Sequence, residues 1–160
     1  MIRQGRIEDA ARMAEIFNHY VRTSTVIFSN DVLSADDMGR RLESVVGRFP
    51  FLVWEENGRV SGYCYVHFFH PDAVYSQTWE LTEYLDHSVL GRGIGTRLLS
   101  ETISLCREAG AHTLLSFITA SNSQCEKMVG SLGFEKCGQI REAGYKFGEY
   151  LDDVIYQLIL

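Results

Sequence analysis

The 160-residue sequence lacks the features that mark membrane, secreted and multidomain proteins. No stretch approaches the ~20 apolar residues of a membrane span, and residues 1–6 carry no apolar run of the kind found in a signal peptide. No Pro- or Ser-rich break, internal repeat or low-complexity segment divides the chain. We therefore expect one domain over residues 1–160, located in the cytoplasm and without contact to a membrane.

Cysteine and clustered positive charge are also scarce. The four cysteines contain no CxxC pair, so we expect reduced thiols, as in a cytosolic protein. The five histidines form no metal-spaced cluster with a cysteine, and we expect no bound metal. A net charge of -6 argues against a nucleic-acid surface. The apolar fraction of 46% is sufficient for a core of ordinary size.

Apolar periodicity and turn residues predict an α+β domain built on one mixed sheet, with the element order βααβββαβαββ. Asn57-Gly58 is a strong hairpin signal, and Ser34 is placed to cap a helix. The predicted strands are 2–6, 51–56, 60–66, 78–85, 113–119, 135–142 and 151–160, with a further extended stretch at 24–28. The predicted helices begin at residues 8, 34, 94 and 124, and the last two end at residues 109 and 132.

The most informative feature is a glycine turn between the strand 78–85 and the helix that follows it. Gly91, Gly93 and Gly95 leave backbone N–H groups uncovered where a helix N-terminus carries partial positive charge. Such a turn binds a pyrophosphate, although it can also simply cap the helix. The G-x-G-x-G spacing does not match the dinucleotide fingerprint, and no lysine follows as in a P-loop.

Residues 90–95 resemble the [QR]-x-x-G-x-[GA] signature of the GNAT superfamily of acetyl-CoA-dependent N-acetyltransferases, with Leu90 in place of the usual Gln or Arg. Collinear segments across the chain are similar to the phosphinothricin N-acetyltransferase branch, at 18–21, 24–28, 48–53, 78–80, 144–148 and 151–154, and at Gln157. The resemblance implies a mixed, mostly antiparallel central sheet flanked by about four helices. It also implies acetyl-CoA as cosubstrate, a small-molecule primary amine as acceptor and a homodimer.

Glu80 holds the position of the glutamate that accepts the amine proton in this branch. Strand alternation places Glu80, Thr82 and Tyr84 on one face. A solvent-facing strand carboxylate is the alternative interpretation. Glu83 is a competing carboxylate where the branch usually has an apolar residue, and we expect it to face solvent or a partner subunit without a catalytic role.

The resemblance also implies a cofactor site. The pantetheine arm is expected along the end of the strand, and the pyrophosphate at the N–H groups of the glycine turn, where Arg92 and Arg97 would add charge. Ordinary solvated arginines and a turn-forming asparagine are the competing interpretations. The expected cofactor-binding residues are Tyr84, Leu85, Asp86, Gly91, Arg92, Gly93, Ile94, Gly95, Thr96, Asn122 and Cys125.

Beyond Asn122, the residues at two positions differ from those usual in the family. Cys125 replaces a small serine, and Val129 replaces an aromatic residue or histidine that is thought to protonate the leaving thiolate. Solvent or the released ammonium proton can serve instead. A catalytically silent CoA-binding regulatory domain is therefore one alternative function. A protein N-terminal or lysine acetyltransferase is the other.

The acceptor is expected to be of the phosphinothricin, methionine sulfone or methionine sulfoximine type. The expected acceptor-binding residues are Phe28, Tyr75, Glu80, Thr82 and Tyr145, with core packing an equal alternative for the three aromatic ones. Asp72 occupies the position where the branch has an arginine. Because like charges repel, we expect acceptors with a less anionic tail to be favoured over phosphinothricin.

Overall fold

The computed structural model describes residues 1–160, and its element order confirms the predicted alternation. Three short 3₁₀ turns, η1 (Ile7–Asp9), η2 (Ala73–Tyr75) and η3 (His87–Val89), lie between the main elements. The helices and strands are β1 (Ile2–Gln4), α1 (Ala10–Thr23), α2 (Ala35–Glu43), β2 (Phe51–Glu56), β3 (Arg59–Phe68), β4 (Thr78–Leu85), α3 (Ile94–Glu108), β5 (Thr113–Thr119), α4 (Ser123–Ser131), β6 (Glu135–Lys146) and β7 (Glu149–Ile159).

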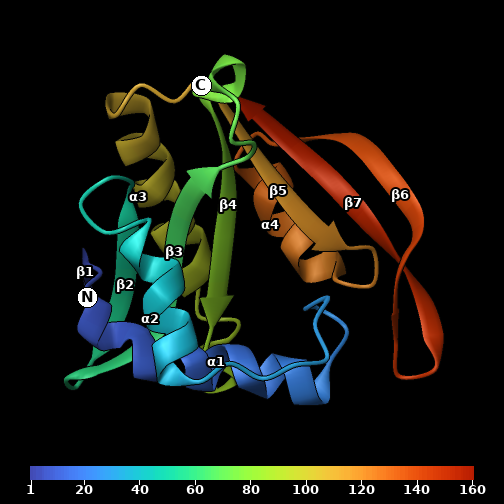
Figure 1. The fold of residues 1–160 in the computed structure, drawn as a ribbon, viewed down its shortest axis with the longest axis horizontal. Helices are drawn as coiled ribbons and strands as arrows, with labels where there is room; N and C mark the ends of the chain where they lie inside the picture. Colours follow the sequence, from blue (N-terminus) through green and yellow to red (C-terminus); the bar gives the residue numbers. More distant parts are fainter.

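One seven-stranded sheet carries the fold, in the order β1-β2-β3-β4-β5-β7-β6. Every neighbouring pair is antiparallel except β4 and β5, which are joined through α3 and run parallel. Helices α1 and α2 cover one face, and α3 and α4 cover the other (Figure 1). The mixed, mostly antiparallel sheet with four helices is the expected fold class, which is confirmed.

The parallel pair β4 and β5 separates partway along its length. The two strands pair only from Thr78 to Glu80 against Thr113 to Leu115. β4 continues to Leu85 and β5 to Thr119, so the remaining residues of each strand lose their neighbour on that side. Figure 1 shows the two strands diverging toward their C-terminal ends. The separation opens a cleft in the middle of the sheet.

The turns and the helix cap that the sequence predicted are present in the structure. Asn57 and Gly58 have φ values of 51° and 74°, which is the pair of positive angles that a type I′ hairpin needs. Ser34 caps α2 by accepting a hydrogen bond from the Asp37 N–H at 3.0 Å. Gly110, with φ of 89°, follows the end of α3. These contacts are short-range, which is why sequence alone predicts them.

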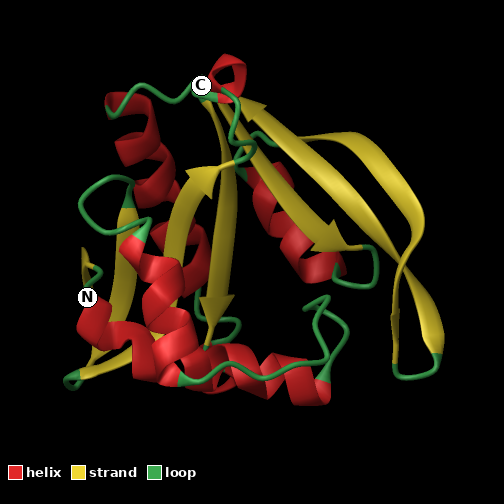
Figure 2. Ribbon diagram, in the orientation of Figure 1, coloured by secondary structure: helices red, strands yellow, loops and turns green.

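Several predicted boundaries were wrong. Residues 24–28 form no strand but belong to the loop between α1 and α2 (Figure 2). That loop is bound by side chains instead: Thr119 donates to the Thr25 carbonyl at 2.8 Å, and Lys146 donates to the Ile27 carbonyl at 3.0 Å. β1 is two residues shorter than predicted, while β6 extends to Lys146 because a bulge with positive φ at Glu142 continues the strand beyond an apparent turn.

The core lies on both sides of the central strands. Met13, Met38 and Leu42 fill the α1–α2 side, and Leu98 and Leu99 fill the α3 side; all are almost fully buried. No helix of the structure combines the length and the hydropathy needed to cross a membrane.

Candidate functional site

Two cavities adjoin β4. The first, of about 380 Å³, occupies the cleft between β4, β5 and α4. The second, of about 370 Å³, lies between α1, α2 and the strands β3 and β4. Glu80, Thr82 and Tyr84 line both cavities. The strand that separates from β5 is therefore also the wall that the two cavities share.

Glu80 stands where the cleft begins, since it is the last residue of β4 that pairs with β5. Burial raises the pKa of its carboxyl because the ionised form loses hydration, and the charge of His67 opposes that shift. His67 is its register partner on β3. A carboxylate at the junction of two cavities, with a raised pKa, is suited to accept a proton from a bound group.

A second carboxyl, which sequence reasoning missed, faces the same cleft. Asp153 on β7 lines it with Glu80, and its pKa is raised by burial and by the negative charge of Glu80. The two residues are distant in sequence and meet because β7 lies beside β5 in the sheet. The signal available was the similarity of residues 151–154 to the branch, which carries no information on where the side chain points.

The turn before α3 presents free backbone donors. Gly91 and Gly93 have φ values of 73° and 72°, and a Cβ at either would meet no atom within 4 Å, so the surface above them is open. The N–H groups of residues 91–96 donate no hydrogen bond within the chain. These free donors and the helix dipole are suited to binding an anion.

The arginines near this turn already have partners. Arg92 binds both oxygens of Glu56, at 3.0 and 2.7 Å, and Arg97 stacks over Trp54 with its guanidinium carbon 5.0 Å from the ring centroid. Ile94 is buried against Trp54, and Thr96 is exposed. The backbone of the turn, rather than the arginines, is the free anion-binding group.

Asp86 holds the loop that leads from β4 to the glycine turn. Its carboxylate accepts from the Ser88 N–H at 2.9 Å and from the Ser88 hydroxyl at 2.6 Å, and it forms an ion pair with Arg12. These contacts lower its pKa to about 2 against the cost of burial. The preceding residue, Leu85, accepts a hydrogen bond from Tyr20 through its carbonyl oxygen at 2.7 Å. These contacts connect the end of β4 to α1.

Helix α4 closes the cleft from the other side. Asn122 caps it, accepting from the Cys125 N–H at 3.2 Å, and both residues line the cleft. Burial raises the pKa of Cys125 to about 12, so it is a neutral thiol. Val129 is buried in the same wall and carries no proton to donate.

The expected acceptor residues fall into two groups. Phe28 lines the cleft, and Thr82 lines both cavities. Tyr75 packs instead against His70, with ring centroids 4.8 Å apart, and Tyr145 packs against Tyr150 at 4.9 Å. Neither of these tyrosines lines the two cavities within this chain. Asp72 is likewise exposed beside His70 and lies outside both cavities.

Arg41 is a further residue that sequence reasoning missed. It extends from α2 over the Phe17 ring, with its guanidinium carbon 5.4 Å from the centroid, and it lines the second cavity together with Glu80. No carboxylate of the chain pairs with it, in contrast to Arg3, Arg12 and Arg92. The second cavity therefore combines an unpaired cation with a carboxyl.

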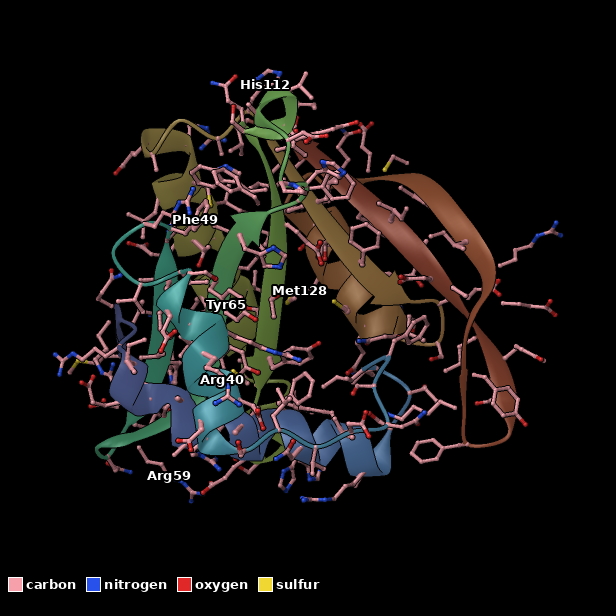
Figure 3. The ribbon with its side chains drawn as sticks, viewed as in Figure 1. Arg40, Phe49, Arg59, Tyr65, His112 and Met128 are labelled. Carbon is pink, nitrogen blue, oxygen red and sulfur yellow. The ribbon has the colours of Figure 1, made fainter.

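The expectation that Glu83 faces solvent or a partner subunit was wrong. Its Oε1 atom is buried without a hydrogen-bond partner, and burial raises the pKa of the carboxyl well above its usual range. Alternation on β4 directs it to the face covered by α3 and α4, opposite Glu80. Met128, labelled in Figure 3, extends from α4 into the same region, and both residues line the cleft.

Comparison with known proteins shows the family to which the chain belongs. The family model described as an acetyltransferase (GNAT) domain matches residues 2–155. The L-amino acid N-acyltransferase MnaT of Escherichia coli (strain K12) is 34% identical over 160 residues, which cover 99% of this chain and 93% of that protein. The L-methionine sulfoximine/L-methionine sulfone acetyltransferase of Salmonella typhimurium (strain LT2) is 32% identical, with 95% of this chain and 90% of that protein covered.

A solved structure agrees over the whole chain. The phosphinothricin acetyltransferase of Sinorhizobium meliloti, in complex with acetyl-CoA, superposes with a TM-score of 0.95 and 28% identity, covering 100% of this chain and 88% of that one.

Proposed function

Because the chain belongs to the GNAT acetyltransferase family, and is thus an N-acetyltransferase, we propose that it transfers an acetyl group from acetyl-CoA to the primary amine of a small amino-acid-like acceptor. The observation that carries the proposal is the position of Glu80. It lies at the point where β4 and β5 separate and faces the two cavities that meet there. One cavity would hold the cofactor and the other the acceptor.

The cleft residues fit acetyl-CoA. The free N–H groups of residues 91–96 would hold the pyrophosphate, and the unpaired edge of β4 at Tyr84 and Leu85 would hold the amides of the pantetheine arm. Asn122 and Cys125 would contact it from α4. When bound, acetyl-CoA supplies an acyl thioester, and every other element of the chemistry comes from the chain.

Glu80 would act as the general base. An alkyl ammonium has a pKa near ~10, so an amine acceptor arrives protonated at neutral pH and must lose a proton before it can attack. The raised pKa of Glu80 brings its basicity closer to neutral pH, and Asp153 beside it favours a cationic group at the mouth of the cleft. Transfer is then direct, because the neutral thiol of Cys125 is a poor nucleophile.

The second cavity supports an amino-acid-like acceptor. Arg41 offers an unpaired guanidinium at its wall, and a guanidinium binds a carboxylate through paired hydrogen bonds. An α-amino acid carries a carboxylate next to its amine, so one molecule can meet Arg41 and Glu80 together. The relatives named for L-amino acids, methionine sulfone and methionine sulfoximine support this class of acceptor.

The proposal extends to assembly and location. The β6–β7 hairpin extends beyond the sheet and exposes Tyr145, Phe147 and Tyr150 at 59%, 61% and 66%. Aromatic side chains exposed together are typical of an interaction surface, which supports a homodimer through this hairpin. The four cysteines are unpaired, which supports a reducing compartment such as the cytoplasm, and residues 1–160 act as one domain.

A panel of amines, assayed with acetyl-CoA and a thiol reagent, tests the proposal. We expect thiol release with methionine sulfone, methionine sulfoximine or free L-amino acids, and little with peptides blocked at the carboxyl end. Release only with peptide N-termini or lysines would favour a protein acetyltransferase. Cofactor binding without release for any amine would favour a regulatory CoA-binding domain.

A further inference from the structure

Glu83 is a carboxyl that the reaction described above does not use. It lies on β4 but points away from Glu80, into the side of the cleft formed by α3 and α4. Its Oε1 atom is buried and has no hydrogen-bond partner in the chain. Native proteins rarely leave a buried polar atom unpaired, because such an atom loses water and gains nothing in return. An unpaired atom of this kind in a ligand cleft indicates that the ligand supplies the partner.

The neighbours of Glu83 provide no charge to pair with it. Cys64 is its register partner on β3, and Cys125 faces it from α4. Both are thiols with raised pKa values, caused first by burial and then by Glu83 itself. From α3 it meets Gly95, where a Cβ would come 3.5 Å from the Glu83 Oε2 atom. Burial is the cause of the raised pKa of Glu83, with no basic group opposing it.

Because Gly95 has no side chain, neighbouring residues approach the first turn of α3 closely at this point. A Cβ there would also lie 3.1 Å from the Met128 sulfur and 3.3 Å from Leu85 Cδ1. The first turn of α3, the end of β4 and α4 therefore converge around the Glu83 carboxyl. A ligand that extends from the free N–H groups before α3 toward Glu80 passes this convergence.

We propose that Glu83 binds the pantetheine arm of acetyl-CoA as a neutral carboxylic acid, donating its O–H hydrogen bond to an amide carbonyl oxygen of the arm. The inference rests on the proposed function, since it requires acetyl-CoA in this cleft. The arm is uncharged and carries amides, each of which has one N–H donor and one carbonyl acceptor. A protonated carboxyl both donates and accepts, so it matches an amide, whereas an ionised carboxylate only accepts.

The proposal predicts a pH dependence of affinity with a defined sign. Below the pKa of Glu83 the donor is present and affinity is constant. As the pH rises through that pKa, the donor is lost and a buried negative charge takes its place, so the carboxylate must take up a proton from the buffer when acetyl-CoA binds. Affinity therefore falls as the pH rises through the pKa of Glu83, and binding above that pKa is coupled to proton uptake.

Calorimetric titration with acetyl-CoA, in the absence of any acceptor, tests this without relying on turnover. Wild-type protein, Glu83→Gln and Glu83→Val are compared over a pH series from neutral to alkaline, in two buffers of different ionisation enthalpy at each pH. We expect wild-type affinity to fall about tenfold as the pH rises through the pKa of Glu83, the value of one hydrogen bond in a dry site. Glu83→Gln, which can still donate, should keep the neutral-pH affinity without that fall or the proton uptake. Glu83→Val should bind about tenfold more weakly at neutral pH.

Glu101→Gln on the exposed surface of α3 is the matched control, and it should reproduce the wild-type profile. Coincident pH profiles for wild type and Glu83→Gln, or wild-type affinity in a folded Glu83→Val, would overturn the inference while leaving the proposed function intact. If Glu83→Val does not fold, the Glu83→Gln profile decides alone. Wild-type protein that binds no acetyl-CoA at all would instead overturn the proposed function, and this inference with it.

Discussion

Glu80 on β4 and Leu115 on β5 form the last residue pair between these two parallel strands. Beyond this pair the two parallel strands separate, and the free edge of β4 faces a cleft instead of a neighbouring strand. The carboxyl of Glu80 thus lies at the point where a ligand bound along the free edge would end. In the proposed reaction, this relationship would place the general base between the cofactor and the acceptor.

Acetyl-CoA should raise the melting temperature, and Gly93→Val should abolish that rise. Gly93 has φ of 72° with open space above it, so a valine both strains the turn and fills the region where the pyrophosphate would lie. Thermal unfolding with and without acetyl-CoA measures the effect. Gly58→Val, at φ of 74° in the hairpin between β2 and β3, is the control, since it carries the same strain but should keep the ligand-induced rise. An unchanged wild-type melting temperature at millimolar acetyl-CoA would contradict cofactor binding.

Glu80→Gln should reduce turnover at neutral pH by about 10²-fold or more, because the amide cannot accept a proton. Turnover should recover partly at high pH, where more of the amine is already neutral. Steady-state rates as a function of pH provide the measurement. Glu80→Gln at the wild-type rate would place the base elsewhere.

Asp153→Asn should leave the maximal rate near that of the wild type and shift the acidic limb of the pH profile. The negative charge of Glu80 raises the pKa of Asp153. Because repulsion between two carboxylates is mutual, we expect the removal of Asp153 to lower the pKa of Glu80. Glu80 is then deprotonated at lower pH, and the rise in rate moves to lower pH. A shift to higher pH, or none, would show that the two carboxyls do not interact.

Arg41→Gln should raise KM for methionine sulfone by about tenfold, the value of one lost charge-assisted contact, with little change in kcat. An amine that lacks the carboxylate should show no such change. Arg40→Gln is the matched control, because Arg40 is exposed on the same helix and pairs with Asp37. Equal effects of Arg41→Gln on both kinds of amine would exclude a carboxylate contact.

The wild-type enzyme should prefer methionine sulfone over phosphinothricin in kcat/KM, as expected from Asp72 in place of the arginine of the branch. Asp72 is exposed and lies outside both cavities of its own chain, so Asp72→Arg also measures whether the loop reaches an acceptor. We expect the arginine to improve phosphinothricin selectively. A strong wild-type preference for phosphinothricin that the arginine does not improve would remove Asp72 from acceptor recognition.

The Asn57-Gly58 hairpin, the Ser34 cap, the glycine turn before α3 and the alternation of Glu80 and Glu83 on β4 follow from the sequence itself. Each depends on backbone angles, or on contacts within a few residues, that the local amino acids determine. The family resemblance was also available from the sequence, through residues 90–95 and through the collinear segments along the chain, because it depends on which amino acids stand at which positions.

Only the tertiary structure decided what these residues face. Asp153 meets Glu80 because β7 lies beside β5, and Arg41 reaches the same region because α2 packs over β3 and β4. Alternation placed Glu83 opposite Glu80 but could not show that α3 and α4 would bury it without a partner. Strand order, helix placement and the separation of β4 from β5 arise from long-range packing, and the environment of a side chain depends on elements that the sequence around it does not contain.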